Sequence, residues 1–177
     1  MILTGSAIAA ARAAGAITIS PYYSTRLGPN SYDLTLGARC KVYNSVELDS
    51  AMENPTTDVP VADDGLLLCP HRVYLFNTEE TVGSTKYVPI VRGRSSVGRL
   101  GLFVHITADL IDLGSINQLT LQLHAVMPVR VYPGMLIAQV TFWTVDGEIT
   151  LYDGKYRNTR SPSGSLSYKD DFNGKRF

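Results

Sequence analysis

Short apolar runs separated by turns rich in glycine, proline and asparagine dominate the hydrophobic pattern of the chain. Ser31–Leu36 and Leu119–Ala125 alternate apolar and polar side chains, as half-buried strands do. Many short strands joined by Gly/Pro turns predict an all-β barrel or sandwich. The other predicted strands are Ile17–Ile19, Leu66–Cys69, Val73–Phe76, Tyr87–Val91, Leu102–Ile106, Val129–Tyr132, Met135–Val145 and Ile149–Tyr152.

Three segments depart from the strand pattern. Thr4–Ala14 is rich in alanine, has Thr4 or Ser6 to cap its start and Gly15 to end it, and so predicts a helix. Val42–Pro60 is polar and weakly patterned, which predicts an irregular excursion. Lys155–Phe177 has almost no aliphatic residues, so its composition predicts a flexible tail unless a ligand, a neighbouring subunit or a larger assembly holds it.

Composition limits the possible partners. The 177 residues include 16 basic and 16 acidic side chains, so the net charge of zero argues against broad capture of nucleic acid and leaves room for a small, focused anion site. With neither a leader pattern nor an apolar run near 18 residues, we expect a soluble protein without a membrane partner.

The two cysteines, Cys40 and Cys69, belong to no CxxC or Cys/His cluster. We therefore expect no zinc site and no disulfide framework. These features predict a reducing compartment, which means the cytoplasm, or the host cytoplasm or virion if the protein is viral.

Candidate chemistry is concentrated in Gly93–Gln122. Ser95, Ser96 and Arg99 offer hydroxyl and guanidinium donors among glycines that let backbone N–H groups approach, a combination suited to phosphate. The alternative interpretation is a polar turn in which Arg94 and Arg99 form surface salt bridges. Arg94 could also pair across a subunit boundary.

Five segments, at matching spacing, resemble the dCTP deaminase branch of the deaminase/dUTPase family. They are Met1–Ile19, PNSYDLTLG at 29–37, GRSSVGRLGLFVHITA at 93–108, GMLIAQVTF at 134–142 and KYRN at 155–158. The resemblance implies a distorted β-barrel or jelly roll of the dUTPase type with a short N-terminal helix. It further implies a homotrimer with active sites between subunits, in which residues 1–154 form the barrel and the tail 155–177 closes over a site or a subunit.

The resemblance also implies the ligand and the roles of individual residues. The ligand would be a deoxynucleoside triphosphate, dCTP or dUTP, with Mg²⁺ held by its phosphates and no zinc. Ser95, Ser96 and Arg99 would form a triphosphate cradle, and Thr107 and Ala108 would position a water or the exocyclic group of a pyrimidine. The residues of the tail that would bind the nucleotide are Tyr152, Lys155 and Tyr156, although Thr159 stands where the family has glutamine.

Asp112 resembles an aspartate that both branches of the family share. A carboxylate there can orient a water for attack on the α-phosphate. The alternative is a turn aspartate that caps its own backbone before Gly114. The sequence leaves both roles open.

The segment departs from the family at its second half. Gln122 occupies the position of the glutamate that serves as general base in deamination, and alternation places it with Thr120 and His124 on one face of the strand. An amide accepts no proton near neutral pH, so deamination should be severely impaired. The preceding turn has changed as well, because the family has a basic residue, Ile-Asp-Pro-Gly, an aromatic residue and another glycine where this chain has Leu110-Ile111-Asp112-Leu113-Gly114-Ser115-Ile116-Asn117.

Two hypotheses follow. The first is an enzyme that deaminates dCTP, hydrolyses dUTP or dCTP to the monophosphate and pyrophosphate, or does both; Gln122 favours hydrolysis. The second is a catalytically inactive trimer of the same fold with a nucleotide-sensing or structural role, for example in a virus particle.

Overall fold

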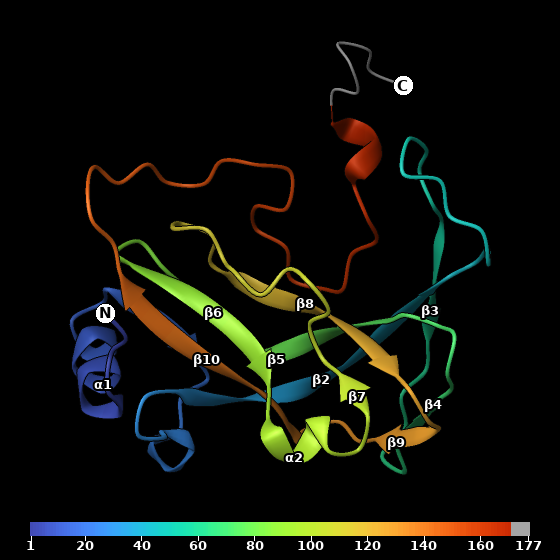
Figure 1. Ribbon diagram of the computed structural model, residues 1–177, viewed down its shortest axis with the longest axis horizontal. Coiled ribbons are helices and arrows are strands. Elements are labelled where there is room, and N and C mark those ends of the chain that lie inside the picture. The colour runs from blue at the N-terminus through green and yellow to red at the C-terminus, as the bar shows by residue number, and fades with distance from the viewer. Residues whose placement is uncertain (171–177) are drawn as a thin grey trace.

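The computed structural model describes residues 1–170, which fold into a nearly closed antiparallel β-barrel with a short helix beside it (Figure 1). The main sheet runs in the order β6 (Tyr87–Gly93), β10 (Leu136–Thr144), β2 (Tyr32–Tyr43), β5 (Tyr74–Ser84), β8 (Asn117–Ala125) and β7 (Leu102–Phe103). β1 (Ile17–Ser20) adds to β5, and β3 (Thr56–Val59) adds to β2. A separate pair joins β4 (Leu66–Leu68) to β9 (Val129–Val131). The expected barrel class is therefore confirmed.

Helix α1 (Gly5–Ala13) confirms the helix prediction. The hydroxyl of Thr4 accepts a hydrogen bond from the amide of Ala7, and Gly15 follows the helix at a φ of +75°. Of two one-turn 3-10 helices, η1 (Ser24–Arg26) lies between β1 and β2, and η2 (Ser167–Lys169) lies in the C-terminal tail. None of the helices in residues 1–170 is both long enough and apolar enough to cross a membrane.

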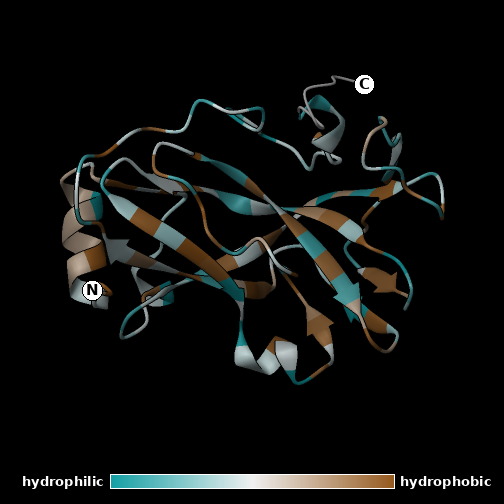
Figure 2. Cartoon of the chain, turned by 45° about the horizontal axis from the view of Figure 1, so that its top comes forward, coloured by the Kyte–Doolittle hydropathy of each residue, from teal (hydrophilic) through white to brown (hydrophobic). Residues whose placement is uncertain are grey.

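Alternation along the strands builds the core. In β8 every second residue from Asn117 to Ala125 is buried, as the sequence pattern predicts, and Figure 2 shows the alternating hydrophilic and hydrophobic bands along the long strands. The largest fully buried side chains of the described chain are Tyr32, Phe76, Phe142, Ile8, Ile17, Ile19, Leu34, Leu36, Leu68, Leu121, Leu123 and Ile137.

Several predicted bounds are wrong. β2 continues to Tyr43 and pairs there with β3, so part of the predicted irregular excursion Val42–Pro60 is strand. β7 ends at Phe103 instead of Ile106. Ile149–Tyr152 forms no strand, since it crosses the turn at Leu113 and makes one backbone hydrogen bond there, from the amide of Tyr152 to the carbonyl of Leu113.

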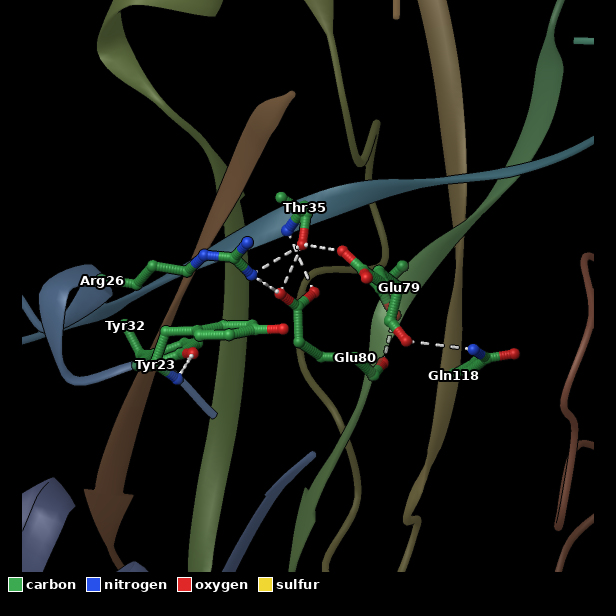
Figure 3. Close-up of polar contacts among 8 residues, drawn as sticks. Tyr23, Arg26, Tyr32, Thr35, Glu79, Glu80 and Gln118 are labelled. Carbon is green, nitrogen blue, oxygen red and sulfur yellow. Dashed lines mark hydrogen bonds and ion pairs between the residues drawn. The ribbon is translucent and has the colours of Figure 1, made fainter. Parts of the chain in front are cut away.

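Sequence patterning also misses most of β5, which continues beyond Phe76 to Ser84, and the one-turn helix α2 (Ser95–Gly98). The pairing of β5 with β8 shifts register between Asn77 and Thr81, and this irregularity turns the polar residues Asn77, Thr78 and Glu80 into the protein. The carboxylate of Glu80 is fully buried, where it accepts hydrogen bonds from Arg26 and from the backbone amide of Thr35 (Figure 3). Because these buried residues of β5 are polar, the strand shows no alternation of apolar and polar side chains there, and the sequence pattern does not predict it.

We expect Gly5→Ala to destabilise the protein. A Cβ at Gly5 would lie 2.2 Å from the backbone oxygen of Gly28, where no flexible side chain can yield. Overpacking of this kind costs about 1–3 kcal/mol of unfolding free energy. Urea unfolding would measure the loss, with Gly98→Ala as the control, because a Cβ at Gly98 meets nothing within 4 Å. Equal stabilities of the two variants would contradict the prediction.

Candidate functional site

A cavity of about 370 Å³ lies between the start of β8, the turn that precedes it and the C-terminal segment. This volume is within the range of small-molecule sites, which is roughly 300–1,000 Å³. The predicted site residues that line it are Ala108, Asp112, Gln122, Tyr152 and Tyr156. The structure therefore brings together half of the residues singled out from the sequence.

The tail forms one wall of this cavity. After β10 the chain crosses the open side of β8, and Figure 1 shows this orange and red segment running above the sheet. The amide of Ser163 donates to the hydroxyl of Thr120 at 3.3 Å, and the amide of Ser165 donates to the hydroxyl of Tyr43 at 2.9 Å. Contacts with its own chain thus hold this part of the tail, whereas residues 171–177 lie outside the described chain.

Tyrosines set the shape of the tail wall. The hydroxyl of Tyr152 accepts from the amide of Tyr156 at 3.1 Å, and the hydroxyl of Tyr156 accepts from the amide of Leu166 at 2.9 Å. Each phenol fixes a later part of the segment, so the tail closes as a series of linked turns.

Gln122 faces the cavity from β8. Its Nε2 donates to the carbonyl of Thr120 at 3.1 Å, so its Oε1 is the end of the amide that remains for a ligand. Within residues 1–170 that oxygen accepts no hydrogen bond. His124, the titratable residue nearest along the same face, lies outside the cavity with its Nδ1 at 3.2 Å from the carbonyl of Arg72.

Sequence reasoning missed His105 and Asn117, which also line the cavity. Within residues 1–170, two buried side-chain polar atoms have no hydrogen-bond partner, and they are His105 Nδ1 and Asn117 Oδ1. Burial lowers the pKa of His105, so the imidazole is neutral near pH 7. Both residues line the main cavity, and His105 also lines the second hollow beside Gly98.

The proposed phosphate cradle lies elsewhere in the same chain. Ser95 and Ser96 are exposed on α2 and Arg99 is exposed directly after it, and Figure 1 shows α2 at the opposite end of the barrel from the tail. None of their side chains has a hydrogen-bond or ion-pair partner within residues 1–170. Thr107 lines a second hollow beside Gly98, which shares His105 with the main cavity that Ala108 lines. A single chain therefore does not join the cradle to the cavity.

Two other basic residues are paired within the chain. Arg94 Nη2 lies 3.1 Å from Asp33 Oδ2, which gives Arg94 a partner that the sequence left open. Lys155 pairs with Asp170 in the tail and does not line the cavity. Of the tail residues implied by the resemblance, Tyr152 and Tyr156 reach the cavity.

Metal ligation by protein side chains alone finds no support in the described chain. Residues 1–170 contain no group of three or more His, Cys, Asp or Glu side chains that could hold an ion. Mg²⁺ is commonly held by one or two carboxylates together with phosphates and waters. The available donor, Asp112 at the cavity, therefore fits an ion that arrives with a triphosphate.

The fold and the cavity define a β-barrel protein with a tail-covered cavity beside β8. The family described as dCTP deaminase-like matches residues 2–145, so the chain belongs to the dCTP deaminase family. A protein of Clostridium botulinum named "dCTP deaminase, dUMP-forming" is 44% identical over 155 residues, which cover 87% of this chain and 90% of that protein. A protein of Leptospira biflexa with the same name is 43% identical over 171 residues, 96% of this chain and 98% of its own.

A solved structure supports the fold independently. The 2′-deoxycytidine 5′-triphosphate deaminase from Agrobacterium tumefaciens superposes with a TM-score of 0.64 at 22% sequence identity. The match covers 80% of this chain and 47% of the other, so this chain spans about half the length of that structure. The expected relationship to the dCTP deaminases is confirmed by family, sequence and fold.

Proposed function

We propose that the protein binds dCTP or dUTP in this cavity and releases pyrophosphate, while it deaminates cytosine slowly or not at all. One observation carries the proposal: Asp112 and Gln122 line the same tail-covered cavity. The carboxylate suited to water attack on phosphorus is present, and the position of the general base holds an amide. Formation of dUMP from dCTP, the reaction in the names of the relatives, requires loss of both ammonia and pyrophosphate.

Gln122 is suited to bind the base, and Asp112 is suited to the hydrolysis at the α-phosphate. Oε1 of Gln122 is suited to accept a hydrogen bond from the exocyclic amine of cytosine or from N3–H of uracil, so it would bind a pyrimidine without activating a water against it. Asp112 would orient the water that attacks the α-phosphate. Mg²⁺ bound with the nucleotide would neutralise phosphate charge and favour departure of pyrophosphate.

The test separates the two products. Purified protein would be incubated with dCTP and with dUTP in the presence of Mg²⁺, and ammonia and pyrophosphate would be followed in parallel. Pyrophosphate without comparable ammonia is the expected result. Ammonia at a comparable rate would overturn the role given to Gln122, and neither product would overturn the enzymatic proposal in favour of the sensing or structural trimer.

A Gln122→Glu variant refines the same test. We expect it to gain little ammonia release, because Leu110 still lines the cavity where the family has a basic residue. Recovery of rapid deamination would show that a single carboxylate limits the reaction.

We further propose that the complete site forms between copies of the chain in a homotrimer. Ser95, Ser96 and Arg99 face away from the cavity of their own chain, so a ligand held by both needs the cradle of another copy. The surface around α2 suits such an interface, because the apolar side chains of Leu100, Phe103 and Val126 are 56%, 54% and 58% exposed.

Mixed oligomers of two inactive variants would test whether the cradle and the cavity of one site come from different copies of the chain. We expect Arg99→Ala and Asp112→Asn homo-oligomers each to release little pyrophosphate. When the two variants are co-expressed and purified together through different tags, some sites would pair an intact cradle with an intact cavity and activity would return. If mixed oligomers stayed as inactive as their parents, the two parts would not be shared between chains.

A further inference from the structure

An ion pair joins the two ends of the tail segment 155–170. Lys155 Nζ pairs with a carboxylate oxygen of Asp170, and the two side chains are 26% and 60% exposed. Between these residues, the hydroxyl of Tyr156 accepts a hydrogen bond from the amide of Leu166 at 2.9 Å. The segment is thereby closed into a loop, and the ammonium of Lys155 is occupied by a carboxylate of its own chain.

Lys155 lies at the edge of the cavity, although it does not line it. Its Nζ is 5.7 Å from the centre of the Tyr156 ring, and Tyr156 lines the cavity. The carbonyl of Tyr156 accepts from Asn117 Nδ2 at 3.2 Å, so this part of the tail is attached to the start of β8. A ligand group that extends out of the cavity past Tyr156 therefore comes close to this ammonium.

The charges of the cavity indicate which ligand group would lie there. Within residues 1–170, no lysine or arginine lines the cavity, and Asp112 adds a negative charge to it. His105 contributes no positive charge near pH 7, because burial lowers its pKa. A triphosphate finds no cationic side chain inside the cavity, so its phosphates favour the edge, where the ammonium of Lys155 is partly open to water.

We propose that Asp170 competes with the phosphates of the bound nucleotide for Lys155. The inference rests on the proposed function, because it takes the ligand to be a nucleoside triphosphate. In the free protein the carboxylate of Asp170 holds the ammonium, and nucleotide binding exchanges this carboxylate for phosphate oxygens. Part of the binding free energy separates the ion pair, so Asp170 lowers the affinity of the site and couples nucleotide binding to opening of the tail loop.

Calorimetry with α,β-imido-dUTP and Mg²⁺ tests the competition. Asp170→Asn should bind the analogue about two- to fivefold more tightly than the wild type, because an exposed ion pair changes an equilibrium constant by no more than about fivefold. Lys155→Gln should weaken binding, and Asp170→Asn added to it should bring no gain. Asp146→Asn is the matched control, since it removes one negative charge from an exposed turn that does not line the cavity and should leave the affinity nearly unchanged.

Cross-linking follows the ion pair directly. A water-soluble carbodiimide condenses a carboxylate with a neighbouring amine to an amide, with loss of water. The Lys155–Asp170 cross-link should form in the free wild-type protein, and saturating α,β-imido-dUTP should suppress it. Peptide mass spectrometry would measure its yield.

Three results would overturn the inference while nucleotide binding still supports the proposed ligand. They are an unchanged affinity of Asp170→Asn, a gain that persists when Lys155 is replaced, and a cross-link that the saturating analogue leaves at full yield. Failure of the wild-type protein to bind the analogue would overturn the proposed ligand and this inference together.

Discussion

Asp112→Asn is expected to slow pyrophosphate release by about 100-fold or more while nucleotide binding changes much less. The substitution keeps the size of the side chain and removes the charge that would orient and partly deprotonate the attacking water, a contribution of typically 10²–10⁴-fold. Asp112 is exposed to the cavity and its side chain makes no hydrogen bond within residues 1–170, so the fold does not depend on its charge. Single-turnover release of pyrophosphate, together with calorimetric binding, would measure the two effects separately.

Asp153→Asn is the matched control for this prediction. Asp153 lies on the same C-terminal side of the molecule, is exposed and pairs with Arg157, but does not line the cavity. We expect its variant to retain nearly wild-type activity, because exposed ion pairs contribute little. If Asp112→Asn lost no more activity than this control, Asp112 would have no part in the hydrolysis.

The sequence predicts those elements whose burial follows a simple period. β8 alternates because one face packs on the core, and α1 has both its cap and its terminating glycine within the segment. The polar part of β5 could not be predicted in this way. The buried carboxylate of Glu80 is paired with Arg26, a residue far along the chain, and no local pattern records such a partner.

The same distinction applies to the candidate site. Motif resemblance pointed to Ala108, Asp112 and Gln122, and the structure places all three on one cavity. The resemblance gave no signal for Asn117. The amide of this residue is oriented by the carbonyl of Tyr156, which lies in the tail and is far along the sequence. Ser95 and the cavity residues Asp112 and Gln122 belong to one continuous stretch of sequence. Their separation in space is therefore a property of the tertiary structure, which the motif does not predict.

The second large effect is expected at Glu80, where the barrel buries a charge. Arg26 Nη1 lies 2.6 Å from Glu80 Oε1, and the amide of Thr35 donates to Glu80 Oε2 at 3.0 Å (Figure 3). The hydroxyl of Thr35 lies between the carboxylates of Glu80 and Glu79 and has one proton to share between them. Removing the buried carboxylate would leave the guanidinium of Arg26 and the amide of Thr35 without their acceptor.

Glu80→Ala should therefore lower the unfolding free energy by about 3–5 kcal/mol, the usual cost of removing one partner of a buried ion pair. Glu79→Ala is the neighbouring control, and because Glu79 is exposed its loss should cost no more than about 1 kcal/mol. Urea unfolding of both variants, and of Arg26→Ala alone and combined with Glu80→Ala, would measure the coupling. The double variant should lose less than the sum of the single ones, because the second substitution removes a charge that the first has already left unpaired. Strict additivity, or equal losses at Glu79 and Glu80, would show that the buried pair does not stabilise the barrel.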